Sequence, residues 1–287
     1  MSIAFEGVSF SYEGAGGRLV LDDVNLTVHD GEFLGIAGHT GSGKSTLVQH
    51  MNGILHPTAG RIVACGVNLA DRKAQAKVRG RIGVVFQYPE HQLFAATVAE
   101  DVAFGPRNLG VGADEIDARV DRALACAGLD PASVRDASPF ELSGGQQRRV
   151  AFAGVLAMNP EVIVMDEPAA GLDPQGREEL LDLISSLHDE GLTVVMVSHS
   201  MSDLAKRCDR IVVMSEGSVF MQGSPAEVFS HEDELRDIGL DVPPAQKLAS
   251  RLRARGAILP RGLYTVDTLA QDIARCYRVT MAHEEVR

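Results

Sequence analysis

The amino-acid sequence predicts an α/β fold, in which an N-terminal antiparallel β subdomain precedes a parallel-sheet core with an α-helical insertion and a small C-terminal helical extension. Three observations predict this fold. Short apolar runs without alternation are typical of parallel strands that helices cover on both faces. A segment that alternates apolar and polar residues precedes these runs, and segments with a 3.6-residue apolar period interrupt and follow them.

The first fifty residues predict a β-hairpin and then a strand, a loop and a helix. Residues 3–12 mix β-branched and aromatic side chains, and residues 19–28 alternate apolar and polar ones. The glycine-rich segment 14–17 between them predicts an antiparallel hairpin. Residues 33–37 form an apolar run that leads through a second glycine-rich segment into a predicted helix at 45–51.

Three more apolar runs, at residues 81–86, 161–166 and 193–198, are predicted strands of the parallel sheet. Helical periodicity occurs within an insertion at about 97–158 and again beyond residue 225. We therefore predict one large α/β domain over residues 1–225 and a helical extension over residues 226–287, which we expect to contact a dimer mate or another partner.

Composition and charge exclude some classes of partner. The 287 residues are 45% hydrophobic and 23% charged, with a formal net charge of −12, which is typical of a folded globular protein. No excess of Lys and Arg is present to neutralise phosphates, so we expect no nucleic acid partner. No stretch reaches the roughly 18 apolar residues of a membrane span, so we expect another chain to provide any attachment to a membrane.

The glycine-rich segment from residue 38 to residue 45 matches the phosphate-binding loop G-x-x-x-x-G-K-[ST] of a P-loop NTPase, and it lies between a predicted strand and a predicted helix. Its glycines let backbone N–H groups surround a phosphate, and the helix N-terminus adds partial positive charge. Lys44 would reach the β- and γ-phosphates, and the Ser45 hydroxyl would ligate Mg²⁺. The predicted nucleotide contacts are Gly38, His39, Thr40, Gly41, Ser42, Gly43, Lys44, Ser45 and Thr46.

Two carboxylates follow the predicted strand at 161–166. Asp166 suits Mg²⁺, and Glu167 is placed to orient or deprotonate a water that attacks the γ-phosphate. Two acids after an apolar strand are by themselves typical of a solvated strand end. Together with the phosphate-binding loop they predict a nucleotide hydrolase.

A second anion site is predicted where Leu142, Ser143, Gly144, Gly145 and Gln146 open a helix. Its N–H groups and its serine hydroxyl can bind an anion. Because it lacks a lysine, this site suits a γ-phosphate that is held by another site. The segment therefore predicts a dimer.

These motifs occur in the order found in the ATPase subunits of ATP-binding cassette (ABC) transporters, which the chain resembles over about residues 3–225. The resemblance implies that the phosphate-binding loop is the Walker A loop and that the second anion site is the signature. Asp166 and Glu167 would form Walker B with its catalytic glutamate. The resemblance also implies that Gln87 is the Q-loop glutamine, with catalytic and metal-binding roles, and that His199 is the switch histidine. Gly171, Leu172 and Asp173 would form the D-loop, and Tyr12 would be the aromatic residue that stacks on adenine.

A closer resemblance lies around Gln87. Residues 86–110 and 140–158 look like the ATPases of energy-coupling-factor (ECF) transporters, which import vitamins or the transition metals cobalt and nickel. Residues 88–91 and 198–201 look more like the second (A2-type) of the two ATPase subunits, and the chain is CbiO-like in this respect.

The resemblance implies ATP and Mg²⁺ as cofactors and a second ABC ATPase as the partner, in a heterodimer or a homodimer. It also implies a membrane coupling protein contacted near Gln87 to Thr97, a separate substrate-binding membrane protein, and a peripheral position on the cytoplasmic face of the cell membrane. Three alternatives stay open: the ATPase of a conventional ABC transporter, a soluble ABC-type ATPase in DNA repair or translation, and a cassette that binds ATP without hydrolysing it.

Overall fold

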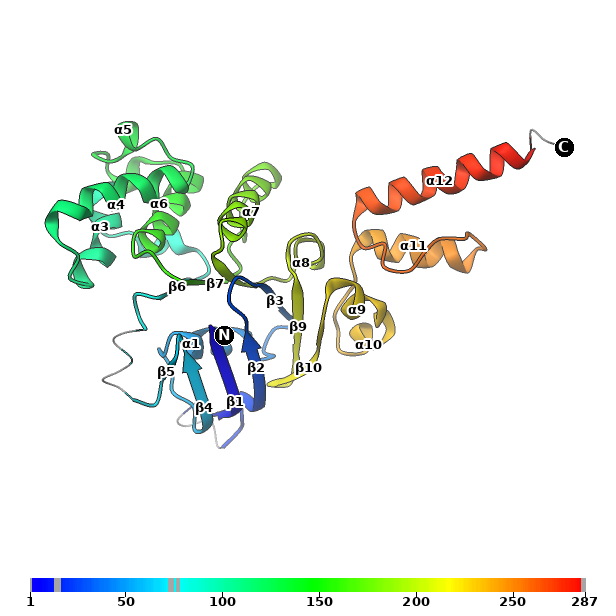
Figure 1. The fold of residues 1–287 in the computed structure, drawn as a ribbon, viewed down its shortest axis with the longest axis horizontal. Helices are drawn as coiled ribbons and strands as arrows, with labels where there is room; N and C mark the ends of the chain where they lie inside the picture. Colours follow the sequence, from blue (N-terminus) through cyan, green and yellow to red (C-terminus); the bar gives the residue numbers. More distant parts are fainter. Residues whose placement is uncertain (1, 13–16, 72–74, 76–77, 285–287) are drawn as a thin grey trace.

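The computed structural model describes residues 2–12, 17–71, 75 and 78–284, and its elements are arranged around two β-sheets (Figure 1). The strands are β1 (Ile3–Phe10), β2 (Leu21–Val28), β3 (Phe33–Gly38), β4 (Ala59–Ala64), β5 (Val67–Asn68), β6 (Ile82–Val85), β7 (Val162–Asp166), β8 (Thr193–Val197), β9 (Arg210–Ser215) and β10 (Ser218–Gly223). The helices are α1 (Lys44–Met51), α3 (Val98–Asn108), α4 (Ala113–Cys126), α5 (Pro131–Val134), α6 (Gly144–Leu156), α7 (Pro174–Asp189), α8 (Met201–Arg207), α9 (Pro225–Ser230), α10 (Glu232–Asp237), α11 (Pro244–Ala254) and α12 (Val266–Glu284), with the 3-10 helices η1 (Pro89–Gln92) and η2 (Pro139–Glu141).

The smaller sheet confirms the predicted antiparallel β subdomain and has the strand order β2-β1-β4-β5. β1 and β2 pair antiparallel, with Ile3 opposite Val28 and Phe5 opposite Leu26. Residues 14–16 of the predicted turn lie outside the described part of the chain, so the turn stays a prediction. The strands β4 and β5, which complete this sheet, were not predicted from the sequence.

The larger sheet has the order β10-β9-β3-β8-β7-β6. β9, β3, β8, β7 and β6 run parallel, whereas β10 adds an antiparallel edge. Neither β9 nor β10 was predicted from the sequence. Every residue of β8 is buried, and so are the first four residues of β7, which is why these strands lack alternation. Because the strands run parallel, the segments after β3, β8, β7 and β6 leave the sheet at one edge.

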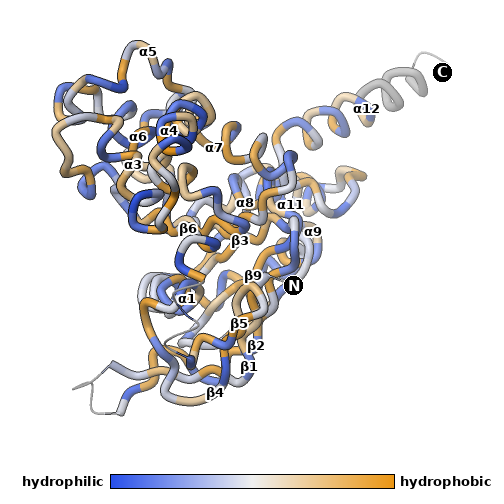
Figure 2. Tube along the Cα trace, turned by 60° about the vertical axis from the view of Figure 1, so that its left-hand side comes forward, coloured by the Kyte–Doolittle hydropathy of each residue, from blue (hydrophilic) through white to orange (hydrophobic). Residues whose placement is uncertain are grey.

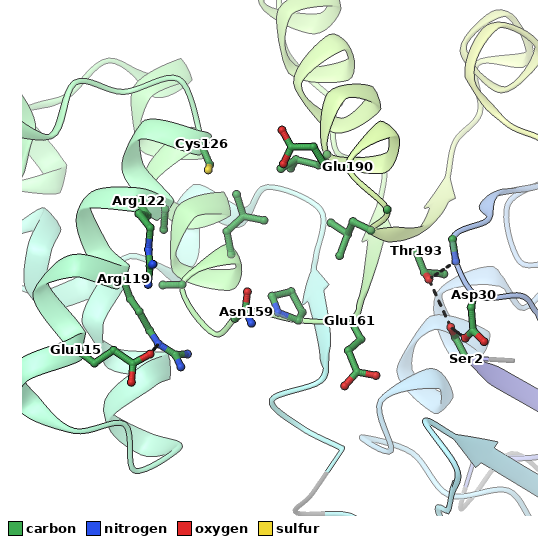
Figure 3. A pocket seen from close by; sticks show the side chains of 18 residues that line it. Ser2, Asp30, Glu115, Arg119, Arg122, Cys126, Asn159, Glu161, Glu190 and Thr193 are labelled. Atoms are coloured by element: carbon green, nitrogen blue, oxygen red, sulfur yellow. Dashed lines mark hydrogen bonds and ion pairs between the residues drawn. The ribbon is translucent and has the colours of Figure 1, made fainter.

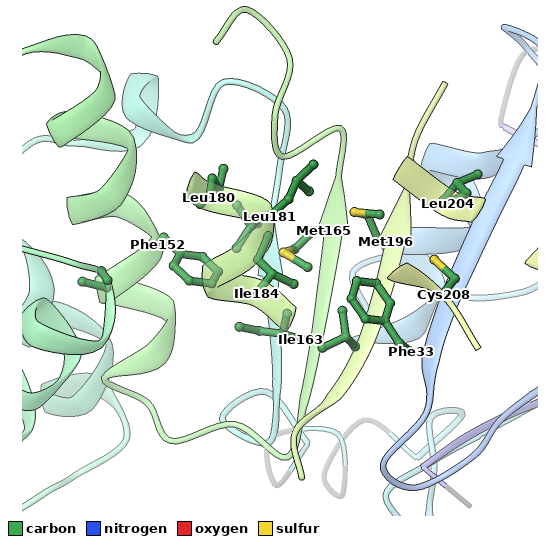
Figure 4. Packing of buried hydrophobic residues seen from close by; sticks show 14 of the residues in the cluster. Phe33, Phe152, Ile163, Met165, Leu180, Leu181, Ile184, Met196, Leu204 and Cys208 are labelled. Carbon is green, nitrogen blue, oxygen red and sulfur yellow. The ribbon is translucent and has the colours of Figure 1, made fainter. Parts of the chain in front are cut away.

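The larger sheet separates two apolar cores. Side chains of one face pack with α1 and the smaller sheet, and side chains of the other face pack with α7, α8 and the helical insertion. Figure 4 shows the second core, where Ile163 and Met165 of β7 lie near Ile184 of α7 and Phe152 of α6 approaches the same helix. Phe152 is 2% exposed, so this contact anchors α6 on the second core.

Helices α3 to α6 form the helical insertion, and α9 to α12 follow the last strand. α11 and α12 have a small core of their own, which includes Ala249, Leu263 and Leu269. Figure 2 shows that α12 extends away from the sheets and carries mixed apolar and polar residues. Among the described residues, none of the helices combines the length and the apolar character needed to cross a lipid bilayer.

A buried histidine at the end of α1 predicts a pH dependence of stability. His50 is 0% exposed, and burial lowers its pKa below 6.5. A hydrogen bond between its Nδ1 and the Thr46 carbonyl raises the pKa, but by less than burial lowers it. When the pH falls from 7 to 5, the unfolded chain therefore takes up a proton that the folded chain resists. We expect the free energy of unfolding to fall by roughly 1 kcal/mol more in the wild type than in His50→Gln, which does not titrate.

Chemical denaturation of both proteins at several pH values measures this difference. The comparison with His50→Gln removes contributions from other titrating groups, because both proteins share them. Parallel pH profiles for the two proteins would contradict a lowered pKa at His50.

Candidate functional site

The phosphate-binding loop connects β3 to α1 at the carboxyl edge of the larger sheet. Gly43, the residue before α1, has φ of 100°, and an added Cβ would lie 2.8 Å from the Val20 carbonyl oxygen, so this position requires glycine. Its lack of a side chain also leaves the α1 N-terminus without a side-chain cap. The first N–H groups of α1 are therefore open to an anionic ligand.

Lys44 lies in this loop with only 7% of its surface exposed. Its Nζ donates hydrogen bonds to the carbonyl oxygens of Gly38, at 2.8 Å, and His39, at 2.9 Å. Burial lowers the pKa of Lys44, while the nearby charges of Glu167 and Asp166 raise it. The interaction with these two carboxylates places Lys44 near the predicted acidic pair.

Glu167 follows β7 in a strained backbone conformation, with φ of 53°. Burial and the adjacent charge of Asp166 raise the pKa of Glu167 to about 7. Its Oε1 is buried without a hydrogen bond, although it lies 3.5 Å from Nε2 of His199. A carboxyl with this pKa and a free oxygen can accept a proton from a bound water near neutral pH.

His199 follows β8 and faces the same small cavity as Glu167. Burial and the charge of Lys44 lower the pKa of His199, which favours the neutral imidazole. The cavity has a volume of about 170 Å³, and Gly171 and Leu172 of the predicted D-loop also line it. Glu167, His199 and the D-loop are therefore brought together.

Tyr12 and Gln87 lie at the edge of this arrangement. The Tyr12 hydroxyl is 3.2 Å from Oγ1 of Thr46 in α1, and its ring is 44% exposed. An exposed ring tied to the phosphate-binding helix is available for stacking on a base. Gln87 follows β6, the neighbour of β7, and its side chain is exposed. Neither residue contacts the Glu167 cavity.

The predicted signature lies on the helical insertion. Ser143 and Gln146 form a capping box, in which the Ser143 hydroxyl accepts a hydrogen bond from the Gln146 N–H and Gln146 Oε1 accepts from the Ser143 N–H. An added Cβ at Gly144 or Gly145 would meet nothing within 4 Å. Leu142 packs against the apolar core. The start of α6 is therefore exposed and has an intact helix cap.

The chain does not bring the signature to its own phosphate-binding loop. α1 packs on β3, β4 and β7, whereas α6 packs on α3, α4, η1 and β6. A shallow cavity of about 220 Å³ at the signature is lined by Ser143, Gly145 and Gln146, and no residue of the phosphate-binding loop lines it. The two predicted anion sites are thus on separate surfaces of one chain.

The D-loop lies between these two surfaces. Leu172 lines both the cavity of Glu167 and the cavity of the signature. Asp173 caps α7 by accepting a 2.6 Å hydrogen bond from the Gly176 N–H, and Gly171 has φ of 77°. The cap and the turn fix the D-loop at the start of a long helix.

Two ion pairs near these motifs were missed in the sequence analysis. Arg148 of α6 forms two hydrogen bonds with Glu90 of η1, at 2.7 Å and 3.0 Å. Arg177 of α7 pairs with Asp203 of α8. The sequence could have indicated that Arg148 is buried, because it lies one helical turn before the apolar Phe152 and therefore on the buried face of the predicted helix.

A larger cleft of about 750 Å³ lies at the opposite ends of the parallel strands, where their amino ends are (Figure 3). It opens between α4, which contributes Arg119 and Arg122, and the amino ends of β7 and β8, next to Glu161 and Thr193. None of the predicted site residues lines this cleft. Ligands of parallel sheets bind at the carboxyl ends of the strands, where all the predicted motifs of the sheet lie.

Comparison with known proteins agrees with this geometry. Residues 21–170 match the family model described as ABC transporter. The energy-coupling factor transporter ATP-binding protein EcfA2 of Symbiobacterium thermophilum is 57% identical over 270 residues, which are 93% of this chain and 93% of that protein.

Two solved structures share the fold. The structure of cbiO1 from Clostridium perfringens, described as part of the ABC transporter complex cbiONQ, is 40% identical with a TM-score of 0.73 and covers 83% of this chain and 94% of that one. The dimeric post-hydrolysis structure of the ATP-binding cassette MJ0796, bound to ADP and Pi, is 31% identical with a TM-score of 0.70 and covers 78% and 98% of the two chains. The predicted fold class and the resemblance to the A2-type ATPase are confirmed. The chain therefore belongs to the ATP-binding subunits of ABC transporters, in the energy-coupling factor group, and it is an ATPase.

Proposed function

We propose that the chain pairs with a second ABC ATPase, closes around two ATP molecules, and couples their hydrolysis to the import of a vitamin or a transition-metal ion of the cobalt and nickel class. The partner is a related ATPase in a heterodimer, or a second copy in a homodimer. A membrane coupling protein and a separate substrate-binding membrane protein complete the transporter. The chain would sit peripherally on the cytoplasmic face of the cell membrane.

The observation that carries this proposal is the separation of the two anion sites. Lys44 and the open N-terminus of α1 suit the phosphates of one ATP, and the far side of the γ-phosphate needs further hydrogen-bond donors. The start of α6 offers such donors on another surface. Two chains that face each other complete each site with the Walker A loop of one and the signature of the other.

Within each site the residues of this chain have distinct roles. Lys44 and the loop N–H groups bind the phosphates, and Tyr12 stacks on the adenine. Glu167 accepts the proton of the attacking water at its free Oε1, and His199 orients the γ-phosphate and this carboxylate. The D-loop contacts the opposite chain, because it lies between the Glu167 cavity and the signature surface. The pKa shifts of Lys44, Glu167 and His199, and the 3.5 Å distance between Glu167 Oε1 and His199 Nε2, support the roles of these three residues.

Mg²⁺ fits the oxygen donors at this edge of the sheet. Ser45 supplies a hydroxyl, Asp166 a carboxylate and Gln87 an amide oxygen, and Mg²⁺ prefers oxygen ligands together with substrate phosphates. Such an ion would neutralise charge that develops on the phosphates during transfer.

The membrane coupling protein would contact residues 87–97. In this segment the Phe94 side chain is 59% exposed and its ring packs edge to face on Phe104 of α3, at a centroid distance of 4.9 Å. Tyr88 is 42% exposed and its ring stacks on His91. Exposed aromatic side chains of this kind are typical of a binding surface. Glu90 is the exception, because its carboxylate points inward to Arg148.

The test is to purify the tagged chain from detergent-solubilised membranes and to identify the proteins that accompany it. Recovery with a second ATPase and two integral membrane proteins is expected. Recovery with a permease and an external binding protein would favour a conventional ABC transporter. Recovery of the chain alone in the soluble fraction would favour a soluble ABC-type ATPase that acts in DNA repair or translation.

A substitution at Gly145 separates the function of the dimer from the stability of the chain. The site of the added Cβ is open in the chain, so Gly145→Glu should leave the melting temperature almost unchanged. In the closed dimer the new side chain would occupy the space of the partner's γ-phosphate and repel it. We expect ATP hydrolysis to fall by roughly 10-fold or more, with little change in ATP binding to the Walker A loop.

Melting curves, binding of a labelled ATP analogue and steady-state hydrolysis measure the three quantities. Gly112→Glu is a matched control, because its added Cβ also meets open space in the helical insertion, away from the signature. Equal hydrolysis by Gly145→Glu and Gly112→Glu would exclude the signature as a phosphate site.

A further inference from the structure

Arg148 connects three segments that carry ATPase motifs. Its side chain is 5% exposed, and it extends from α6, five residues after the signature serine. On one side it binds the Glu90 carboxylate of η1, three residues after Gln87. On the other side its Nη1 donates to the carbonyl oxygens of Ala170, at 2.6 Å, and Pro168, at 3.4 Å.

The two carbonyl groups belong to the short loop between Glu167 and the D-loop. Pro168 directly follows Glu167, and Ala170 directly precedes Gly171. A backbone carbonyl that accepts from a buried guanidinium is held in position, because the alternative is an unsatisfied charged donor. Arg148 thus holds the backbone of the loop that directly follows Glu167.

The pair with Glu90 is ionised and well shielded. The side chain of Glu90 is 16% exposed. Burial raises the pKa of Glu90, but the hydrogen bonds from Arg148, a backbone hydrogen bond and the charge of Arg148 together outweigh this effect, and the resulting pKa lies below the ordinary value. The planar guanidinium engages both carboxylate oxygens and the loop carbonyls at once, which a lysine cannot do.

We propose that Arg148 is a positioning residue for ATP hydrolysis, which locks η1, the signature helix and the loop after Glu167 into one rigid unit. A displacement of η1 would then move the loop that carries Glu167 and the D-loop, and a displacement of the signature helix would do the same. Arg148 touches no reacting atom itself. This role of Arg148 concerns ATP hydrolysis by the chain and does not depend on what the transporter imports.

The test is a double-mutant cycle on the full chain, measured together with the proteins that co-purify with it. Glu90→Gln, Arg148→Met and the double variant are compared for kcat, for KM of ATP, and for the binding of a labelled ATP analogue. We expect each single variant to lose roughly 10- to 100-fold in kcat, because small misplacements of reacting groups have effects of this size. KM and analogue binding should stay within about twofold, because the phosphate-binding loop is not touched.

The kcat of the double variant should be no more than about twofold below that of the worse single variant, since both residues act through one contact. Arg148→Lys should recover only part of kcat, because it keeps the charge but not the forked geometry. Arg135→Met is the matched control: Arg135 pairs with Asp117 and Asp121 inside the helical insertion and reaches none of the motifs. It should change the melting temperature without changing kcat.

Three results would overturn the proposal: an unchanged kcat in Glu90→Gln, losses of the two single variants that multiply in the double variant, or a parallel loss of ATP analogue binding. If Arg148→Met does not fold, the cycle is built with Arg148→Lys in its place, and the same criteria apply. A purely structural role would lower the melting temperature of these variants and leave kcat at low temperature as in the wild type.

Discussion

Glu167→Gln should bind ATP as well as the wild type and hydrolyse it at least about 100-fold more slowly. The substitution preserves the size of the side chain but removes its ability to accept a proton, and general-base catalysis contributes roughly 10²- to 10⁴-fold. A pKa of about 7 and a buried Oε1 without a hydrogen bond suit this residue to the role. Phosphate release measured under ATP saturation gives the rate, and binding of a labelled analogue gives the affinity.

The matched control lies at the other end of β7. Glu161 directly precedes this strand, and its side chain is 56% exposed and paired with Arg81. An exposed ion pair contributes little to stability, so Glu161→Gln should hydrolyse ATP at the wild-type rate. Wild-type turnover in Glu167→Gln would remove this residue from the catalytic role.

Lys44→Ala should lose most of its affinity for ATP. The ammonium group is buried in the loop and donates hydrogen bonds to two backbone carbonyls, so its position is fixed before the nucleotide binds. Removing one partner of a buried charge pair costs about 2–5 kcal/mol, which corresponds to a Kd that is at least roughly 30-fold higher. Equilibrium titration with a labelled ATP analogue measures the change.

Lys247→Ala serves as the control for the loss of a positive charge. Lys247 lies in α11 and pairs with Asp241, far along the chain from the nucleotide motifs. Lys247→Ala changes the net charge by the same amount as Lys44→Ala but should leave the Kd for the ATP analogue unchanged. The same Kd in both variants would refute the assignment of the phosphate-binding loop.

Local sequence patterns predicted the parts of the fold that depend on neighbouring residues. The strand, loop and helix around Lys44 follow from glycine spacing and apolar runs within twenty residues, and β7 and β8 follow from their unbroken apolar character. The edge strand β10 was missed, although Glu216 and Gly217, with φ of 49° and 84°, form a tight turn before it. This turn lacks the Asn-Gly or Asp-Gly pair that marks most such hairpins.

Contacts between distant segments could not be predicted in the same way. Glu90 and Arg148 are 58 residues apart, and their pairing follows from how α6 packs on η1. From the sequence, Glu90 was assigned to a surface for the membrane partner. Its inward orientation depends on the three-dimensional fold, whereas the exposed Phe94 in the same segment agrees with the predicted surface.

In the proposed dimer, the capping box of the signature would limit how tightly the two ATPase chains hold each other. In the chain alone, the Ser143 hydroxyl already donates to Gln146 Oε1, at 3.0 Å, and accepts from the Gln146 backbone. A phosphate on the opposite cassette would therefore replace an existing hydrogen bond instead of making a new one, and such exchanges yield only a small net free energy. A dimer interface built on exchanged hydrogen bonds would reopen readily once the γ-phosphate is cleaved, and repeated cycles of ATP hydrolysis require such reopening.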